Sequence, residues 1–334
     1  MLTVVGAVAS VLFGLVLAGI VGAAIGAGAS NANKPVTTTV WGKPDADGRL
    51  VSVEVTGVIM GDSSDGGAFV TGTYGYKVAE AIDSLGKDDA DGLILEMNTP
   101  GGTIYGSRAI ADAVERYQKR TGHTVMAYVK GMAASGGMYA MAGADQVIAD
   151  HGTLVGSIGV IMGPFQRFRD VTGLQGSLLT PGVEAPGGIT EEYLTRGKGK
   201  DFGNPFRDMT PEERAVMEAG LEQEYTGFVD WVSQKRGIPA QTIRDDLGAY
   251  IYDPETAISK GLVDRVMGRD DGYRHAAEMN GLDPADTRVD RVRSDDFLSL
   301  LLGSKSKGEP AGALCTGPAT VLAFSGDLAS VCGR

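Results

Sequence analysis

The sequence predicts an α/β protein with a mainly parallel sheet, and three observations lead to this fold class. Short apolar runs typical of strands occupy residues 50–58, 93–97 and 125–129. Between these runs, apolar residues recur at the three-to-four-residue spacing of helices. Two glycine-rich corners directly follow the second and third runs. This alternation favours helices packed on a parallel sheet, because a parallel crossover needs a long connection.

The first half of the chain contains most of the expected strands. Helices are predicted where apolar residues share one helical face, and strands where short apolar runs lie between turn residues. In chain order, these elements are a strand at 50–58, a helix with Tyr74, Val78, Ile82 and Leu85 on one face, a strand at 93–97, a helix with Ile110, Val114 and Tyr117 on one face, a strand at 125–129, a helix at 135–141, and strands at 146–149 and 155–162.

The second half is expected to be mainly helical. Thr210-Pro211-Glu212-Glu213 is a capping box with proline at the first helical position, and Gly237 ends the long helix that it starts. A shorter helix begins at Asp253-Pro254 and stops at Gly261, before a strand at 262–267. We therefore expect one elaborated α/β domain over residues 50–268, in which residues 210–260 form a helical lobe.

The ends of the chain differ in character from this domain. Residues 1–33 carry no charged side chain, and 2–25 are almost continuously apolar, which is long enough to cross a bilayer core of about 30 Å. An uncleaved membrane anchor and a removable secretion signal are both compatible with this segment, and both direct the protein to a membrane. The missing positive charge before the apolar run favours the anchor, and Lys34 and Lys43 after it leave the topology open.

Three further segments complete the organisation. Residues 34–49 are polar, contain two prolines and are expected to be a linker. Residues 269–302 are expected to be a charged helical extension, and residues 303–334 a flexible tail. The tail holds the two cysteines of the chain, Cys315 and Cys332, which either form a disulfide or remain free thiols.

Composition excludes several function classes. The formal net charge is −12, from 30 basic and 42 acidic residues, which argues against nucleic acid as a partner. Glycine occupies 50 of 334 positions without a Gly-X-Y period, so a collagen-like fibre is excluded. The two cysteines and three histidines show no zinc-like spacing, and neither a metal nor a cofactor is expected.

The two glycine-rich corners are the expected place for chemistry, because ligands of open α/β sheets bind beyond the carboxyl ends of strands. The first is Asn98-Thr99-Pro100-Gly101-Gly102, whose exposed amides could stabilise an oxyanion. The second is Gly131-Met132-Ala133-Ala134-Ser135-Gly136-Gly137, in which small residues let a substrate approach Ser135. Taken alone, each corner also fits an ordinary turn or a serine that caps a helix.

A nucleophilic serine needs a base. His123, His151 and His275 lie in loops or charged segments, and no Ser-His-Asp order surrounds Ser135. The alternative is a lysine, whose pKa must fall from about 10.4 to near 7 or 8, a change that desolvation can supply. Lys198 and Lys200 lie in glycine-rich surroundings, and local chemistry does not choose between them.

Five motifs in order resemble the SppA-type signal peptide peptidase family. They are LILEMNTPGG at 93–102, VKGMAASGGMY at 129–139, GSIGVIM at 156–162, KDFGNPFRDMT at 200–210 and GLVD at 261–264. The resemblance covers residues 50–268 and implies a core similar to the Clp protease subunit and the crotonases. It also implies a Ser/Lys dyad, with Ser135 as nucleophile, Lys200 as general base and Ser157 orienting that lysine. Gly101 and Gly102 would form the oxyanion hole.

The resemblance also implies where and how the protein works. Family members are anchored in membranes by a single span, with the catalytic domain outside the cytoplasm, and assemble into homo-oligomers whose neighbours complete each active site. The expected activity is hydrolysis, through an acyl-enzyme, of extended peptides such as residual signal peptides. The alternatives are an inactive membrane scaffold of the same fold and a crotonase-like acyl-CoA enzyme, which gives no reason for Ser135 and Lys200 to occur together.

Overall fold

The computed structural model describes residues 34–62, 72–175, 182–293 and 322–324. The chain divides into two units, residues 1–36 and 37–334, and the second contains all the strands and helices described below. The predicted anchor at 1–33 lies outside the described residues, as do Cys315 and Cys332. No helix in the four described ranges combines the length and the apolar character needed to span a bilayer.

The main sheet is mostly parallel, as the alternation of strands and helices predicts. Nine strands belong to it within the described ranges, and parallel pairing holds everywhere except at two pairs on its margins, β1 with β14 and β12 with β9. In spatial order they are β1 (Thr37–Trp41), β14 (Thr287–Val292), β2 (Gly48–Thr56), β5 (Gly92–Thr99), β7 (Val125–Ala134), β8 (Gln146–Ala149) and β13 (Arg265–Val266), with β9 (Leu154–Gly156) beside the end of β7 and β12 (Ile251–Tyr252) beside β9.

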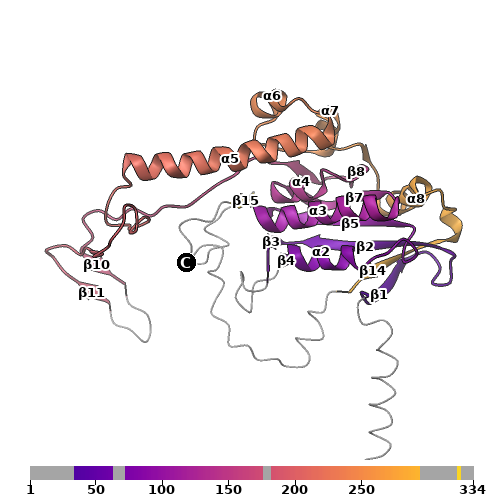
Figure 1. Ribbon diagram of the computed structural model, residues 1–334, viewed down its shortest axis with the longest axis horizontal. Helices are drawn as coiled ribbons and strands as arrows, with labels where there is room; N and C mark the ends of the chain where they lie inside the picture. The colour runs from indigo at the N-terminus through magenta and orange to yellow at the C-terminus, as the bar shows by residue number, and fades with distance from the viewer. Residues whose placement is uncertain (1–33, 63–71, 176–181, 294–321, 325–334) are drawn as a thin grey trace, which may run out of the picture. The chain divides into compact units, whose positions relative to one another are not determined.

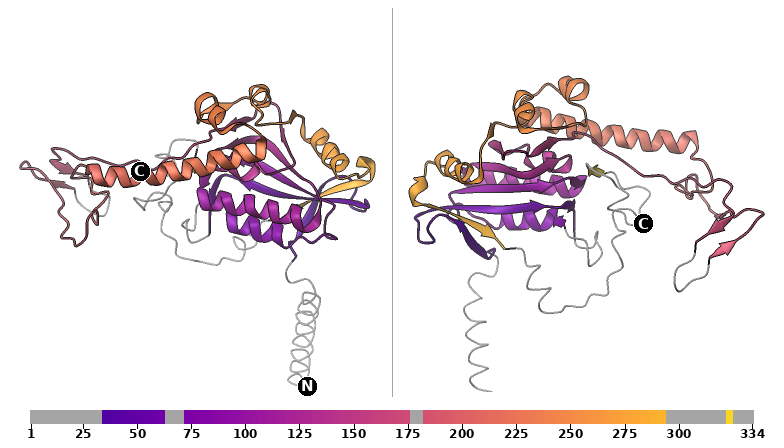
Figure 2. Two further views of the ribbon diagram at one scale, coloured as in Figure 1. Left: turned by 45° about the horizontal axis from the view of Figure 1, so that its top comes forward. Right: turned by 180° about the vertical axis from the view of Figure 1, so that it is seen from behind.

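Helices cover both faces of this sheet, as Figure 1 shows and Figure 2 confirms from behind. On one face lie α2 (Gly75–Asp83), α3 (Ile104–Thr121) and α4 (Gly136–Met141), and on the other lies α8 (Arg269–Met279). Successive side chains of β5 lie on opposite faces of the sheet. Leu93 and Leu95 pack in the core under α2 and α3, and Ile94 packs in the core under α8. Burying such a side chain stabilises the fold by about 1.5–3 kcal/mol.

A second, smaller sheet continues from the carboxyl ends of β2 and β5. It contains β3 (Val58–Met60), which directly follows β2, and β6 (Gly101–Thr103), which directly follows β5. The order is β15-β6-β3-β4, with β4 at Gly72–Tyr74 and β15 at Leu322–Phe324. Figure 1 shows these short strands at one end of the main sheet, so the first glycine-rich corner joins the two sheets.

The helical lobe begins with α5 (Pro211–Arg236), and its predicted start and end are confirmed. The Thr210 hydroxyl accepts from the Glu213 amide at 3.1 Å, the Glu213 carboxylate accepts from the Thr210 amide at 2.9 Å, and Gly237 ends the helix at a positive φ of 67°. Trp231 of α5 stacks on Tyr139 of α4, which packs the lobe on the helix that follows Ser135. The lobe continues as α6 (Ala240–Thr242), a π-helical turn (Ile243–Leu247) and α7 (Pro254–Ser259).

The sheet extends beyond the expected boundaries of 50–268. The expected linker at 34–49 contains β1, and the expected helical extension at 269–302 contains α8 followed by β14, which pairs between β1 and β2. The hydropathy pattern does not predict β14, because the strand contains the charged residues Asp290 and Arg291. In the folded protein these two side chains form ion pairs with Arg49 and Glu96. Two strands are shorter than expected: β9 ends at Gly156, and β13 covers only Arg265–Val266.

Candidate active site

The first corner is fixed by Asn98, which distorts the pairing of β5 with β7. The register is regular up to Met97 with Val129 and then shifts so that Thr99 pairs with Ala133. The Asn98 carboxamide oxygen accepts a hydrogen bond from the Met132 amide at 3.3 Å. It also fills the space that a side chain at Gly131 would need, since a Cβ there would lie 2.4 Å from it. This irregularity in the pairing determines the position of Ser135, which follows the last residue of β7.

Ser135 lies at the junction of β7 and α4 with unusual backbone torsions. Its φ is 55° and its ψ is −115°, a region that side chains rarely adopt and that is typical of functional sites. Its amide donates to the Gly156 carbonyl at 2.8 Å. Although Ser135 occupies the N-cap position of α4, its side chain makes no capping hydrogen bond. The hydroxyl instead lies 3.3 Å from the Gly159 carbonyl, so the ordinary capping explanation does not account for this serine.

Ser157 lies next to Ser135 because β9 pairs with the end of β7. Ala134 pairs with Gly156, so the two serines are the next residues of adjacent parallel strands. Ser157 also has a positive φ, 56°, and both serines are buried. In the described part of the chain, only one other residue besides glycine, Asp170, has a positive φ. The structure therefore brings together two of the predicted site residues in similarly strained conformations.

The two predicted oxyanion glycines lie in β6, close to this junction. The Gly101 amide donates to the Thr99 hydroxyl at 3.0 Å. Gly102 pairs with Ile59 of β3, and a Cβ on Gly102 would lie 1.9 Å from the Ile59 carbonyl oxygen. The backbone of β6 thus requires glycine at 102 for packing. The Thr99 methyl lies close to Gly137 of α4, which brings the two corners into contact.

The three histidines make their contacts elsewhere. His123 lies 3.0 Å from the Lys87 carbonyl, His151 pairs with the neighbouring Asp150, and His275 lies 2.7 Å from the Gln146 side chain. This agrees with the sequence argument against a histidine base.

Lys200 and Lys198 differ in their partners. Lys198 forms an exposed ion pair with Glu212 at 3.3 Å. The Lys200 side chain is exposed and has no ion pair or hydrogen bond within the ranges that the structure describes. The hydroxyl of Ser135 has only the Gly159 carbonyl as a partner within the same ranges. A single chain therefore brings Ser135, Ser157 and the two glycines together, and the Lys200 side chain makes no hydrogen bond with any of these four residues.

The residue after Lys200 is held firmly. Arg207 donates to both Asp201 and Glu213, at 2.7 and 2.9 Å to the first and 2.9 and 2.6 Å to the second. The Arg207 guanidinium lowers the pKa of Asp201 and lowers that of Glu213 to about 2. Because Glu213 also closes the capping box of α5, these three side chains tie the Lys200 segment to the start of that helix.

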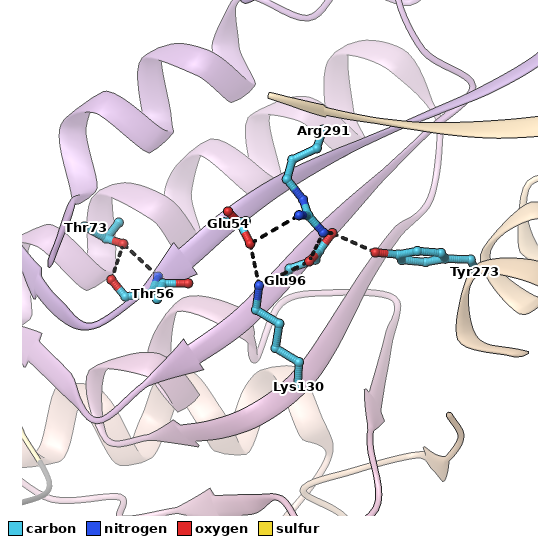
Figure 3. A network of polar contacts seen from close by, with 7 residues as sticks. All are labelled: Glu54, Thr56, Thr73, Glu96, Lys130, Tyr273 and Arg291. Carbon is cyan, nitrogen blue, oxygen red and sulfur yellow. Dashed lines mark hydrogen bonds and ion pairs between the residues drawn. The ribbon is translucent and has the colours of Figure 1, made fainter. Parts of the chain in front are cut away.

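A charged network that the sequence does not reveal braces the strands leading to both corners (Figure 3). Glu96 of β5 is 1% exposed and accepts from Arg291 at 2.7 and 2.8 Å and from the Tyr273 hydroxyl at 2.8 Å. Lys130 of β7 lies 3.4 Å away and also pairs with Glu54. Burial alone would raise the pKa of Glu96, but its hydrogen bonds with Arg291 and Tyr273 and the charge of Lys130 outweigh burial and lower it.

A second link in Figure 3 holds the smaller sheet on the main one. The Thr56 amide at the end of β2 donates to the Thr73 hydroxyl at 2.8 Å, and that hydroxyl donates back to the Thr56 carbonyl at 2.9 Å. Thr73 belongs to β4, so β4 is attached to the strand end from which β3 continues.

Comparisons with known proteins match the region that contains the second corner and Lys200. The model of peptidase family S49 matches residues 117–283, half of the chain. A protein of Methanocaldococcus jannaschii named as a protease is 34% identical over 199 residues, 59% of this chain and 59% of that protein. A protein of Enterococcus faecium named as the signal peptide peptidase SppA is 29% identical over 259 residues, 77% of this chain and 71% of that protein.

The likeness among solved structures is more distant. ClpP1 from Listeria monocytogenes aligns with 66% of this chain and 93% of its own, with a TM-score of 0.42 and 13% sequence identity. Among the relatives, this chain spans less than two thirds of the length of the M. jannaschii protein.

Proposed function

The chain belongs to peptidase family S49, as the five ordered motifs indicate, and we propose that it is a membrane-associated serine endopeptidase with a Ser/Lys dyad. The observation that carries the proposal is the conformation of Ser135. It is a strained serine within the second glycine-rich corner, and its hydroxyl does not cap the helix that follows it. Backbone strain of this kind costs of order 1–3 kcal/mol and persists where the surrounding structure holds it for a function.

In the proposed reaction, the Ser135 oxygen attacks the peptide carbonyl carbon while its proton passes to the uncharged Lys200 amine. The oxyanion is stabilised by the amides of Gly101 and Gly102, which requires the Gly101 amide to leave Thr99. The intermediate then expels the amine of the leaving peptide, which takes the proton from Lys200. Water hydrolyses the acyl-enzyme with Lys200 again as the base, and Ser157 orients that lysine.

The exposed position of Lys200 supports an assembly of several copies. A lysine surrounded by water is charged and cannot accept a proton, so its amine must be removed from water to act as a base. In the proposed homo-oligomer, Lys200 of one copy enters the site of its neighbour, next to Ser135 and Ser157. The Asp201–Arg207–Glu213 contacts hold the segment in place for this docking.

The proposed substrate is an extended peptide derived from membrane segments, such as a residual signal peptide. Short strands at the first corner offer main-chain hydrogen bonds to a peptide that adds as a further strand. The apolar segment at 2–25 supports attachment of the protein to a membrane by a single span, with the catalytic domain outside the cytoplasm.

The test combines a serine-directed fluorophosphonate probe with cleavage of a signal-peptide-like substrate. Ser135→Ala removes the attacking oxygen and is expected to abolish labelling and to lower the cleavage rate at least about a thousandfold. Lys200→Ala is expected to have the same effect, because the serine then keeps its proton. Lys198→Ala is the matched control two residues away and is expected to leave both readouts close to those of the unaltered protein.

Two outcomes would overturn the proposal. Full activity of Lys200→Ala would place the base elsewhere. An unaltered, fully assembled protein that neither reacts with the probe nor cleaves the substrate would instead favour the alternative, an inactive scaffold of the same fold.

A further inference from the structure

The loop that leads into β12 packs against the backbone around both predicted serines. The Ser157 amide donates to the Tyr250 carbonyl at 2.6 Å. A Cβ on Gly159, whose carbonyl is the partner of the Ser135 hydroxyl, would lie 2.9 Å from the Ala249 side chain. Residues 249 and 250 therefore lie directly beside the segment that holds these two serine side chains.

The strand register places Tyr250 opposite Ser157. β12 runs antiparallel to β9 with Tyr252 opposite Val155, and continuing this register for two residues pairs Tyr250 with Ser157. Tyr252 and Val155 pack in the same core, on the face of the sheet that α4 covers. Because side chains two residues apart on a strand lie on one face, Tyr250 is directed to this face, beside Ser157.

The backbone of Tyr250 is fixed, whereas its side chain is exposed. A Cβ on Gly156 would lie 2.5 Å from the Tyr250 carbonyl oxygen, so this close approach requires glycine. The Tyr252 hydroxyl donates to the Leu247 carbonyl at 2.5 Å and closes the loop around residue 250. Tyr250 is nevertheless 72% exposed, and within the described ranges its side chain has no hydrogen bond or aromatic partner. A large side chain is thus held beside the site without a packing role in one chain.

We propose that Tyr250 is a positioning residue for the base, whose ring packs along the stem of Lys200 and keeps water from its amine. This inference rests on the proposed function, in which Lys200 of a neighbouring copy docks beside Ser135 and Ser157. The second corner consists mostly of glycine and alanine, which are too short to cover a lysine side chain. A tyrosine supplies a broad apolar surface, and an amine kept from water gives up its proton at a lower pH.

Several ionisable groups lie on the elements next to Tyr250. Asp253 caps α7, where hydrogen bonds from Thr256 lower the pKa of its carboxyl group. The Lys260 amine lies 4.9 Å from the centre of the Tyr252 ring. The others are Asp245 and Asp246 of the π-helical turn and Glu255 of α7. The substitutions below leave all of these groups in place, so a change that follows the size and polarity of residue 250 reports on Lys200.

The test measures the rate at which the fluorophosphonate probe labels Ser135 in the assembled full chain, over a pH range from about 5 to 10. This readout needs the base but no peptide, and the rate is expected to fall toward acid as Lys200 becomes protonated. Tyr250→Ala and Tyr250→Gln expose the amine to water. Both are expected to raise the midpoint of this fall by about one pH unit, which slows labelling about tenfold at pH values below the midpoint.

Two matched controls separate the cover from a general loosening of the loop. Tyr250→Phe keeps the ring and is expected to keep the midpoint. Ile251→Ala shortens the adjacent side chain, which lies on the opposite face of β12, and is also expected to keep it. Sedimentation velocity establishes that each variant is assembled before labelling.

Three results would overturn the proposal. One is an unchanged midpoint in both Tyr250→Ala and Tyr250→Gln, and another is an equal shift in Ile251→Ala. The third is a downward shift, which would mean that the ring stabilises the charged amine through a cation–π contact.

Failure of the proposed function would look different. If the unaltered assembly is not labelled, or if Lys200→Ala is labelled at the unaltered rate, the dyad fails and the role of Tyr250 fails with it. If labelling requires Lys200 and the midpoint is the same in all Tyr250 variants, the dyad stands and only the role of Tyr250 is excluded. A change confined to the KM of peptide cleavage, with an unchanged labelling profile, would make Tyr250 a substrate contact and would also overturn the proposal.

Discussion

At the residue scale, single side chains hold the two corners in place, either by a contact between the corners or by contacts on the strands that lead to them. Asn98 lies opposite the bulge in β7, and Glu96, two residues before Asn98, is the buried centre of a network that joins β5, β7, β14 and α8. A buried carboxylate is tolerated only when its hydrogen-bonding capacity is satisfied, and Arg291, Tyr273 and Lys130 together do this. These contacts connect β5, which contains Asn98, with β7, which ends directly before Ser135.

Removing the charge of Glu96 is therefore expected to destabilise the fold. Glu96→Gln leaves the Arg291 guanidinium without its carboxylate, and breaking a buried ion pair costs about 3–5 kcal/mol. Urea unfolding followed by circular dichroism measures this change in the free energy of unfolding. Glu54→Gln is the control in the same network, and because Glu54 is 39% exposed its effect is expected to stay below about 1 kcal/mol. Equal effects of the two variants would contradict the assigned role.

At the scale of elements, the start of α5 combines three devices that act together. The capping box satisfies the first amides of the helix, Pro211 favours its first turn, and Arg207 connects Glu213 to Asp201, next to Lys200. The segment with the proposed base is thus attached to a helix start that is fixed by a capping box. These contacts depend on the charges of two carboxylates.

The attachment is expected to weaken in acid. The pKa of Glu213 in the folded protein is about 2, below its ordinary value of 4.5, so its contribution to stability is complete above about pH 4.5. That contribution is lost as the pH falls from about 4.5 toward 2, and the lowered pKa of Asp201 acts in the same direction. Hydrogen-exchange protection factors of residues 210–214 measure the effect.

Glu213→Gln provides the control for this prediction. The variant has no charge to lose at position 213, so protection at the start of α5 is expected to be lower at neutral pH and to change less toward acid. A protection profile of the unaltered protein that is constant between pH 6 and 3 would contradict the role of these charges.

At the scale of the whole molecule, the proposed site is incomplete in one chain. The fold brings Ser135, Ser157 and the glycines of β6 together, and the exposed Lys200 side chain makes no hydrogen bond with these residues. The proposed completion by a neighbouring copy would make activity a property of the assembly.

Mixing of inactive subunits tests this arrangement. Ser135→Ala and Lys200→Ala proteins are each expected to be inactive, and a 1:1 mixture that is allowed to exchange subunits is expected to regain about a quarter of full activity, since each neighbour is drawn at random. Peptide cleavage before and after exchange measures the recovery. Ser135→Ala mixed with the Ser135→Ala, Lys200→Ala double variant is the control and stays inactive. No recovery after verified exchange would place both residues of the dyad in one chain.

Local patterns predict most of the core. The capping box and Gly237 define α5, and the apolar runs at 93–97 and 125–129 become the central strands β5 and β7, because these signals depend on neighbours in the sequence. The positions of Ser135 and the site glycines after strand ends follow from the same patterns, whereas Ser157 is predicted inside a strand at 155–162 and lies directly after β9, which ends at Gly156. The ordered motifs, through the family resemblance, predict that Ser135 and Lys200 form a dyad. The Ser135→Ala and Lys200→Ala variants and the mixing of subunits test this prediction.

Some features required the tertiary structure, because their stabilising partners are distant in the sequence. β14 forms between β1 and β2 although it is charged, since Arg291 meets Glu96 and Asp290 meets Arg49 only after folding. β15 is a strand only through its pairing with β6, within a tail whose glycines suggest no regular structure. The sequence by itself determined the alternating α/β core and the motifs of the site, because periodicity and capping act over a few residues. Only the tertiary structure decided which charges are matched and which edge the C-terminal segment occupies, because those energies arise between residues that the chain brings together on folding.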